Sequence, residues 1–196
     1  MTRRASLCCL VVLALSGCGE RDAAAPGPAP VPAPAAQQAP ADDGAAEAVP
    51  PGFDDEARGA PVAARQPDAP VLVDVRTGEH EGFDRLVFEF DADALPQWRA
   101  EWVDIPITDC GAGHVVAVAG TAWLQVRFSG AAAHTPEGKP TSGPRQRRLR
   151  HPVLRDLVRT CDFEGEVAWV AGLSGRRPFR TDTLASPPRL VIDIAH

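Results

Sequence analysis

A long segment rich in alanine and proline near the N-terminus limits which part of this chain can fold. From Arg21 to Pro70, 28 of 50 residues are Ala or Pro, and the only large apolar side chain is that of Phe53. The prolines interrupt any helix that the alanines favour, and the segment has too little apolar surface to offset the entropy of ordering it. We therefore expect a disordered, acidic linker over residues 19–69 and a single folded domain over residues 70–196.

The first 18 residues have the features of an export signal. Arg3 and Arg4 precede an apolar run, Ala5–Leu15, that is too short to span a bilayer of about 30 Å. The run ends in Leu15-Ser16-Gly17-Cys18, which resembles the bacterial lipobox, the cleavage motif of lipoprotein signal peptides. The resemblance implies that Cys18 is acylated and becomes the first residue of a mature lipoprotein. An ordinary cleaved secretory signal is the alternative.

These features predict a location in the cell envelope, because several acyl chains on one cysteine hold a protein firmly at a membrane. Gly19, not Asp, follows Cys18. By analogy with Gram-negative lipoproteins, this favours the outer membrane, facing the periplasm, if the host has one. Residues 71–196 carry seventeen acidic and fifteen basic side chains, so the expected domain is nearly neutral. This balance argues against a nucleic-acid partner, since such binders usually present a net basic face.

Two cysteines, Cys110 and Cys161, fall within the expected domain. In an exported chain an isolated pair favours a disulfide, because two thiolates alone cannot complete a tetrahedral zinc site. We therefore expect a bridge that closes a loop of about 50 residues. Two buried free thiols are the alternative.

After Pro70, short runs of β-branched and aromatic residues alternate with Gly, Pro and Asp. The alternation of period two is clearest at Val71–Arg76 and at Leu86–Asp91. Many short runs of this kind predict an all-β fold, mainly an antiparallel β-sandwich, with a partly closed barrel as the alternative. Further strands are expected at Trp98–Ile107, His114–Val118, Ala122–Phe128, Val167–Gly172 and Leu190–Ile194.

The segment Val153–Cys161 fits two interpretations. Its apolar residues have helical spacing, and Pro152 could occupy a first helical turn. A strand is favoured, because the glycine-containing turn that follows would then form a hairpin with Val167–Gly172. A second tight turn is expected at Ala119–Thr121, between His114–Val118 and Ala122–Phe128.

Four sequence elements of the expected domain stand in a recognisable order. They are Val75–Phe90, Gly120–Val126, Phe163–Gly165 with Gly172–Leu173, and Pro178–Arg180 with Pro187–Ile194. Together they resemble the AMIN-like domain, a relative of the AMIN modules of periplasmic amidases and secretin-type pore proteins. The resemblance covers nearly all of residues 70–196. It implies a β-sandwich that binds or localises in the envelope, with peptidoglycan as the ligand attributed to AMIN modules, and it implies no catalytic residues.

Common catalytic and metal-binding patterns are absent from the sequence. The segment Gly172–Arg176 departs from the Gly-x-Ser-x-Gly pattern of serine hydrolases at its last position, and the five histidines lie singly. The pair Cys110 and Cys161 lacks the Cys-x-x-Cys spacing of redox enzymes. We therefore expect no enzymatic activity, no metal and no cofactor.

A run of arginines is the one candidate ligand-binding cluster. Arg145, Arg147, Arg148 and Arg150 follow a long polar loop. Planar guanidinium groups bind carboxylate and phosphate oxygens in bidentate fashion, which suits peptidoglycan, another anionic envelope polymer or an acidic protein. A solvated surface patch is the alternative.

The sequence thus predicts a membrane-tethered lipoprotein of the cell envelope with a non-catalytic binding or localisation domain. Two other functions stay open. One is a structural or assembly lipoprotein that docks on an envelope protein, and the other is a cell-wall hydrolase with an unrecognised site.

Overall fold

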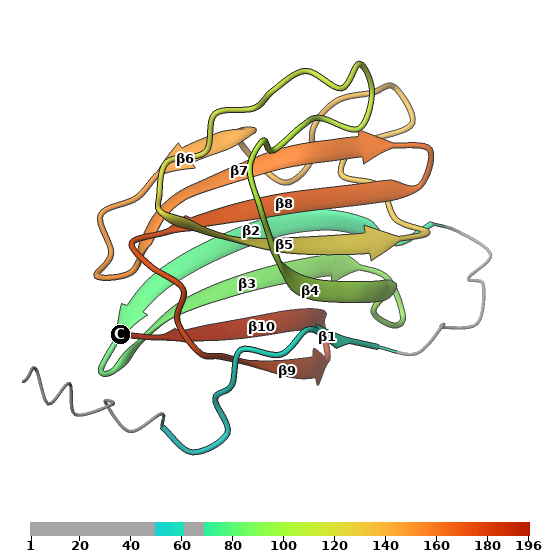
Figure 1. The fold of residues 1–196 in the computed structure, drawn as a ribbon. Helices are drawn as coiled ribbons and strands as arrows, with labels where there is room; N and C mark the ends of the chain where they lie inside the picture. Colours follow the sequence, from blue (N-terminus) through green and yellow to red (C-terminus); the bar gives the residue numbers. More distant parts are fainter. Residues whose placement is uncertain (1–49, 61–68) are drawn as a thin grey trace, which may run out of the picture. The chain divides into compact units, whose positions relative to one another are not determined.

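The computed structural model describes residues 50–60 and 69–196, and in these residues the secondary structure is entirely β (Figure 1). None of the described residues forms a helix long and apolar enough to cross a membrane. Residues Ala46–His196 form one compact unit. Because the hydrophobic core lies within this unit, we treat it as a part that folds on its own.

The ten strands form two antiparallel sheets that pack face to face, which confirms the predicted β-sandwich. The four-stranded sheet has the order β2 (Val71–His80), β3 (Phe83–Asp91), β10 (Pro188–Ala195) and β9 (Phe179–Ala185). The six-stranded sheet has the order β1 (Arg58–Gly59), β4 (Gln97–Val103), β5 (Ala122–Ser129), β8 (Glu166–Leu173), β7 (Leu154–Phe163) and β6 (Gln146–Arg148).

The core lies between the sheets and follows from the alternation of side chains along each strand. On β5, Leu124, Val126 and Phe128 are fully buried, whereas the residues between them face outward. Phe128 joins the two layers, because its ring lies 5.1 Å from that of Phe88 and 4.9 Å from that of Phe90, both on β3. Edge-to-face contacts of this kind add to the stability that burial of the rings provides.

Most of the predicted strands are present, and three differences are informative. The segment 153–161 lies mainly in strand β7, which forms a hairpin with β8, so the helical alternative is wrong. The strand predicted at Trp98–Ile107 ends at Val103. The strand predicted at His114–Val118 is wrong, since this segment belongs to a loop that pairs only through a single bridge, Thr108 with Val115.

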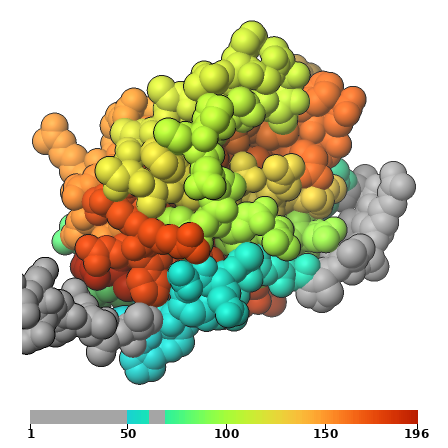
Figure 2. Space-filling model, viewed as in Figure 1, coloured from blue at the N-terminus to red at the C-terminus, as the bar shows by residue number. Residues whose placement is uncertain are grey.

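Residues 50–60, which we call the N-terminal clasp, differ from the sequence expectation of a disordered linker. Phe53 is only 9% exposed, Asp54 forms a β-bridge with Phe179 of β9, and Arg58 and Gly59 pair with β4. The clasp therefore contacts an edge of each sheet, where it satisfies backbone groups that would otherwise be unpaired (Figure 2). The remaining parts of the leader and linker, including Cys18, lie outside the described residues.

Candidate functional site

The outer face of the six-stranded sheet is crossed by the connection between β4 and β5, residues 104–121, which we call the strap (Figure 1). Its two limbs are hydrogen-bonded to each other. The Asp109 N–H donates to the His114 carbonyl at 3.0 Å, and the Val116 N–H donates to the Ile107 carbonyl at 2.8 Å. The strap is therefore an ordered lobe laid over the sheet.

Covalent and polar contacts fasten the strap to the strands beneath it. The predicted disulfide is confirmed: Cys110 of the strap is bonded to Cys161 of β7. Further along, the fully buried carboxylate of Asp156 accepts a hydrogen bond from the Ala119 N–H at 2.9 Å. A Cβ at Gly172 would lie 1.9 Å from the Ala119 carbonyl oxygen, so only glycine lets the strap approach β8 this closely.

The arginine run does not form one uniform surface, because part of it is the edge strand β6. Arg147 points inward: its guanidinium donates to the carbonyls of Val75 and, at 2.8 Å, of Ser142, and lies 6.0 Å from the Trp169 ring. Burial lowers the pKa of Arg147 below its ordinary value, although Asp74 opposes this shift. Arg147 thus joins the two sheets, and the structure removes it from the predicted ligand-binding patch.

Arg145 and Arg148 instead face a cavity of about 530 Å³ between the strap and strands β6 and β7, which we call the arginine cavity. Arg148 lies 3.2 Å from the Asp156 carboxylate, yet 60% of its side chain is exposed. Arg145 donates through Nε to the Arg159 carbonyl at 3.1 Å. Within residues 50–60 and 69–196, neither Arg145 nor exposed Arg150 has an acidic partner in an ion pair. Their cationic groups are therefore available to a ligand.

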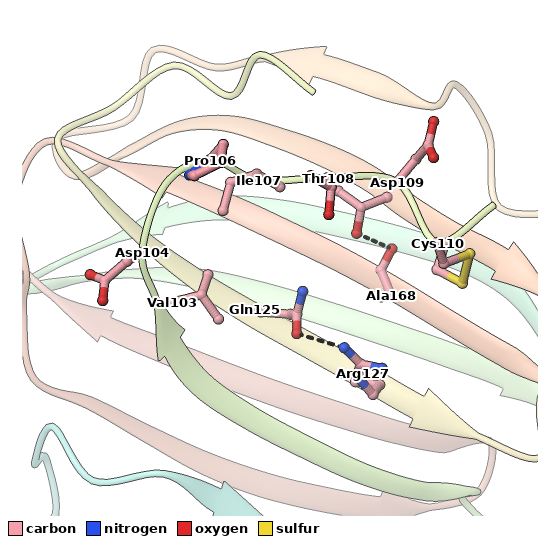
Figure 3. Close-up of a pocket in the computed structure, with 12 residues that line it drawn as sticks. Val103, Asp104, Pro106, Ile107, Thr108, Asp109, Cys110, Gln125, Arg127 and Ala168 are labelled. Atoms are coloured by element: carbon pink, nitrogen blue, oxygen red, sulfur yellow. Dashed lines mark hydrogen bonds between the residues drawn. A yellow bond between two sulfur atoms is a disulfide. The ribbon is translucent and has the colours of Figure 1, made fainter. Parts of the chain in front are cut away.

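Two more cavities adjoin the strap. One, of about 390 Å³, lies beside the disulfide and is mainly polar (Figure 3). Its floor includes Gln125 and Arg127 of β5, which are hydrogen-bonded to each other at 3.2 Å, and its wall includes Thr108 of the strap. The other, which we call the apolar cavity, has about 530 Å³ and is lined only by Ile105–Ile107, Val115–Val118 and Trp123.

Sequence reasoning missed the strap and its floor. Trp123, Gln125 and Arg127 alternate with buried residues of β5, so the period of the strand places them on the outer face. This alternation can be read from the sequence, but the sequence does not show that a loop covers the outer face of β5. Among the described residues, no three His, Cys, Asp or Glu side chains are placed to hold a metal ion.

Comparison with known proteins agrees with this description of the fold. The family model of the AMIN-like domain matches residues 70–196, a range that includes β2 to β10 and the strap. No curated protein and no solved structure matches the chain.

Proposed function

The chain belongs to the AMIN-like domain family, and from this premise we propose that it is a lipoprotein that binds an anionic polymer of the bacterial cell envelope. AMIN-like domains are generally non-catalytic binding domains, which supports a binding role. In this proposal the lipid on Cys18 keeps the protein at a membrane, and the sandwich contacts the polymer.

The observation that carries the proposal is the arginine cavity. Arg145 and Arg148 line it, and Arg150 lies two residues further along the chain. Exposed guanidinium groups without a full set of acidic partners bind carboxylates or phosphates in bidentate geometry. The stem carboxylates of peptidoglycan fit this chemistry, so peptidoglycan is the first polymer to test.

A sedimentation experiment with purified peptidoglycan sacculi tests the binding. The compact unit, residues 46–196, is expected to pellet with the sacculi, and less of it should pellet at higher salt, since exposed charge contacts are screened. The double substitution Arg145→Gln and Arg148→Gln should weaken binding by about tenfold, which corresponds to about 1.4 kcal/mol.

The matched control removes two arginines from the other sheet. Arg76 and Arg189 lie on β2 and β10, away from the strap. Arg76→Gln with Arg189→Gln makes the same change in net charge and should leave binding unchanged. If both double variants weaken binding equally, net charge rather than the arginine cavity is responsible. If the unit does not pellet but co-purifies with one stoichiometric protein, the assembly role replaces this proposal.

The membrane tether has its own test. In cells grown with labelled palmitate, the full chain should incorporate the label and remain in the membrane pellet. Cys18→Ser removes the acylated thiol, so this variant should carry no label. A labelled Cys18→Ser protein would contradict the tether without affecting the binding proposal.

A further inference from the structure

The arginine cavity adjoins the apolar cavity across one limb of the strap. Both cavities are lined by Val115, Val116 and Ala117. On one side of this limb are the guanidinium groups of Arg145 and Arg148, and on the other are Ile105 and the Trp123 ring. A charged subsite and an apolar subsite, each of about 530 Å³, thus lie next to each other on one face.

The apolar subsite is open to a ligand. Val115 is 72% exposed and Ile105 is 64% exposed, and these are the two most exposed large hydrophobic side chains among the described residues. The indole N–H of Trp123 donates to the Val118 carbonyl at 3.2 Å, so the polar atom of this side chain is already satisfied by the strap. The ring therefore offers mainly apolar surface to whatever occupies the cavity.

We propose that the strap binds an anionic amphiphile: one molecule whose phosphate lies at Arg145 and Arg148 and whose hydrocarbon chain lies on Val115, Ile105 and Trp123. This inference rests on the proposed function, because it uses the same arginines, and it adds a second ligand for that site: a phosphate-bearing lipid. A wholly polar polymer would use the arginines and leave the exposed apolar side chains in water. An amphiphile contacts both groups of side chains. Its phosphate is opposite in charge to Arg145 and Arg148, while Asp109, which also lines the arginine cavity, lies 3.6 Å from His114.

Titration calorimetry of residues 46–196 with three soluble probes tests the proposal. Dihexanoyl phosphatidylglycerol, below its micelle concentration, carries both an anionic phosphate and short chains. Glycerol phosphate carries the anion alone, and dihexanoyl phosphatidylcholine carries the chains with a zwitterionic headgroup. Phosphatidylglycerol is expected to bind at least about tenfold more tightly than either of the others. Equal affinity for glycerol phosphate would overturn the apolar subsite, and equal affinity for phosphatidylcholine would overturn the anionic one.

Substitutions separate this inference from the proposed function. Ile105→Asn with Val115→Asn should reduce the affinity for phosphatidylglycerol to that for glycerol phosphate, and should leave sedimentation with sacculi unchanged. Because both side chains are mostly exposed, these changes should not disturb folding, which near-ultraviolet circular dichroism checks. Leu184→Asn, a change of an exposed leucine on β9, is the matched control and should have no effect.

The two proposals fail in different ways. If Arg145→Gln with Arg148→Gln binds sacculi and phosphatidylglycerol like the wild type, the anionic site itself is wrong. If that variant loses binding while Ile105→Asn with Val115→Asn binds phosphatidylglycerol like the wild type, only the amphiphile is excluded.

Discussion

The two outer faces of the sandwich differ in how their charged side chains are paired. On the four-stranded sheet, cross-strand ion pairs join several of the charged side chains, although Arg189 has no acidic partner among the described residues. Arg76 lies 2.8 Å from Glu89, and the carboxylate of Asp193 is shared by Arg85 at 2.7 Å and Arg180 at 2.9 Å. No connection of the described residues crosses this face as the strap crosses the other, and these ion pairs mainly hold neighbouring strands together.

On the six-stranded sheet, the buried acid is used to fasten the strap, while several cations lack partners. Asp156 accepts hydrogen bonds from the Ala119 N–H and, at 2.9 Å, from Gln146. Arg145 and Arg150 have no acidic partner in the described part of the chain. Unlike Arg147, which joins the two sheets, and Arg148, which pairs with Asp156, these two arginines hold no acid of the fold, and for this reason we assign the ligand to that face.

The largest expected effect comes from removing the disulfide. Cys110 and Cys161 are 51 residues apart in the sequence, and the disulfide between them closes this segment into a loop. Cys110→Ala with Cys161→Ala removes that crosslink. The chain-entropy estimate for a loop of this length is about 4 kcal/mol of unfolding free energy. Urea denaturation of the variant and the wild type measures the loss. A loss below about 1 kcal/mol would mean that the other contacts alone hold the strap.

The next effect tests the acid beneath the strap. The Asp156 carboxylate accepts hydrogen bonds from the Ala119 N–H, the Gln146 amide and the Leu157 N–H, and it forms an ion pair with Arg148. Asp156→Asn replaces one carboxylate oxygen by an NH2 group that itself donates, so a donor is left unpaired inside the protein. We expect a loss of about 3 kcal/mol in unfolding free energy. Asp104→Asn, at an exposed position of the strap, is the control and should change stability by less than about 0.5 kcal/mol. Similar values for both variants would show that Asp156 does not fasten the strap.

Asp193, a buried acid of the four-stranded sheet, gives a smaller effect that depends on pH. Burial raises the pKa of the Asp193 carboxyl, but the hydrogen bonds from Arg85 and Arg180 lower it more, so the pKa lies below its ordinary value. A carboxyl with a lowered pKa stabilises the folded state fully above its unfolded pKa of about 3.9. This contribution is lost as the pH falls through the folded pKa.

We therefore expect Asp193→Asn to lower the unfolding free energy by about 2 kcal/mol at pH 7. The difference in unfolding free energy between wild type and variant should become smaller as the pH is lowered below about 4. Urea denaturation at pH 7, 5, 4 and 3 measures it. A gap that is constant over this range would contradict the role of the charged carboxylate.

The smallest effect concerns an exposed ion pair of the same sheet. Arg76 is 46% exposed on its side chain and pairs with Asp74 and Glu89. Exposed pairs contribute little after screening, so Arg76→Gln should cost less than about 1 kcal/mol. Thermal unfolding at low and high salt checks this value. A larger, salt-insensitive loss would show that the four-stranded sheet depends on this pair.

The sequence predicts the strands whose alternation is strong and leaves the weakly patterned ones undetected. Leu124, Val126 and Phe128 mark β5 because one face of this strand is fully buried. Strands β6 and β9 are rich in polar residues and stand last in their sheets, so their hydrophobic signal is weak. The β-branched residues of His114–Val118 mimic a strand, but they form a limb of the strap.

The candidate site is predictable only in part, because a run of like residues does not reveal which side chains turn inward. Once β6 is known, its period of two places Gln146 and Arg148 on one face and Arg147 on the other. The two cysteines predict the bridge, but not that it fastens a loop over a sheet. The juxtaposition of Val115 with Arg145 depends on long-range packing, which local patterns do not encode.

Hydrogen exchange with and without soluble peptidoglycan fragments is the sharpest test of where the ligand binds, because it compares both outer faces in one sample. Binding at the strap should slow exchange of amides in residues 114–117 and 145–148. It should leave exchange in β3 and β10 of the four-stranded sheet unchanged. Slower exchange on β3 and β10 with none at the strap would contradict the assignment of the ligand to the strap-covered face.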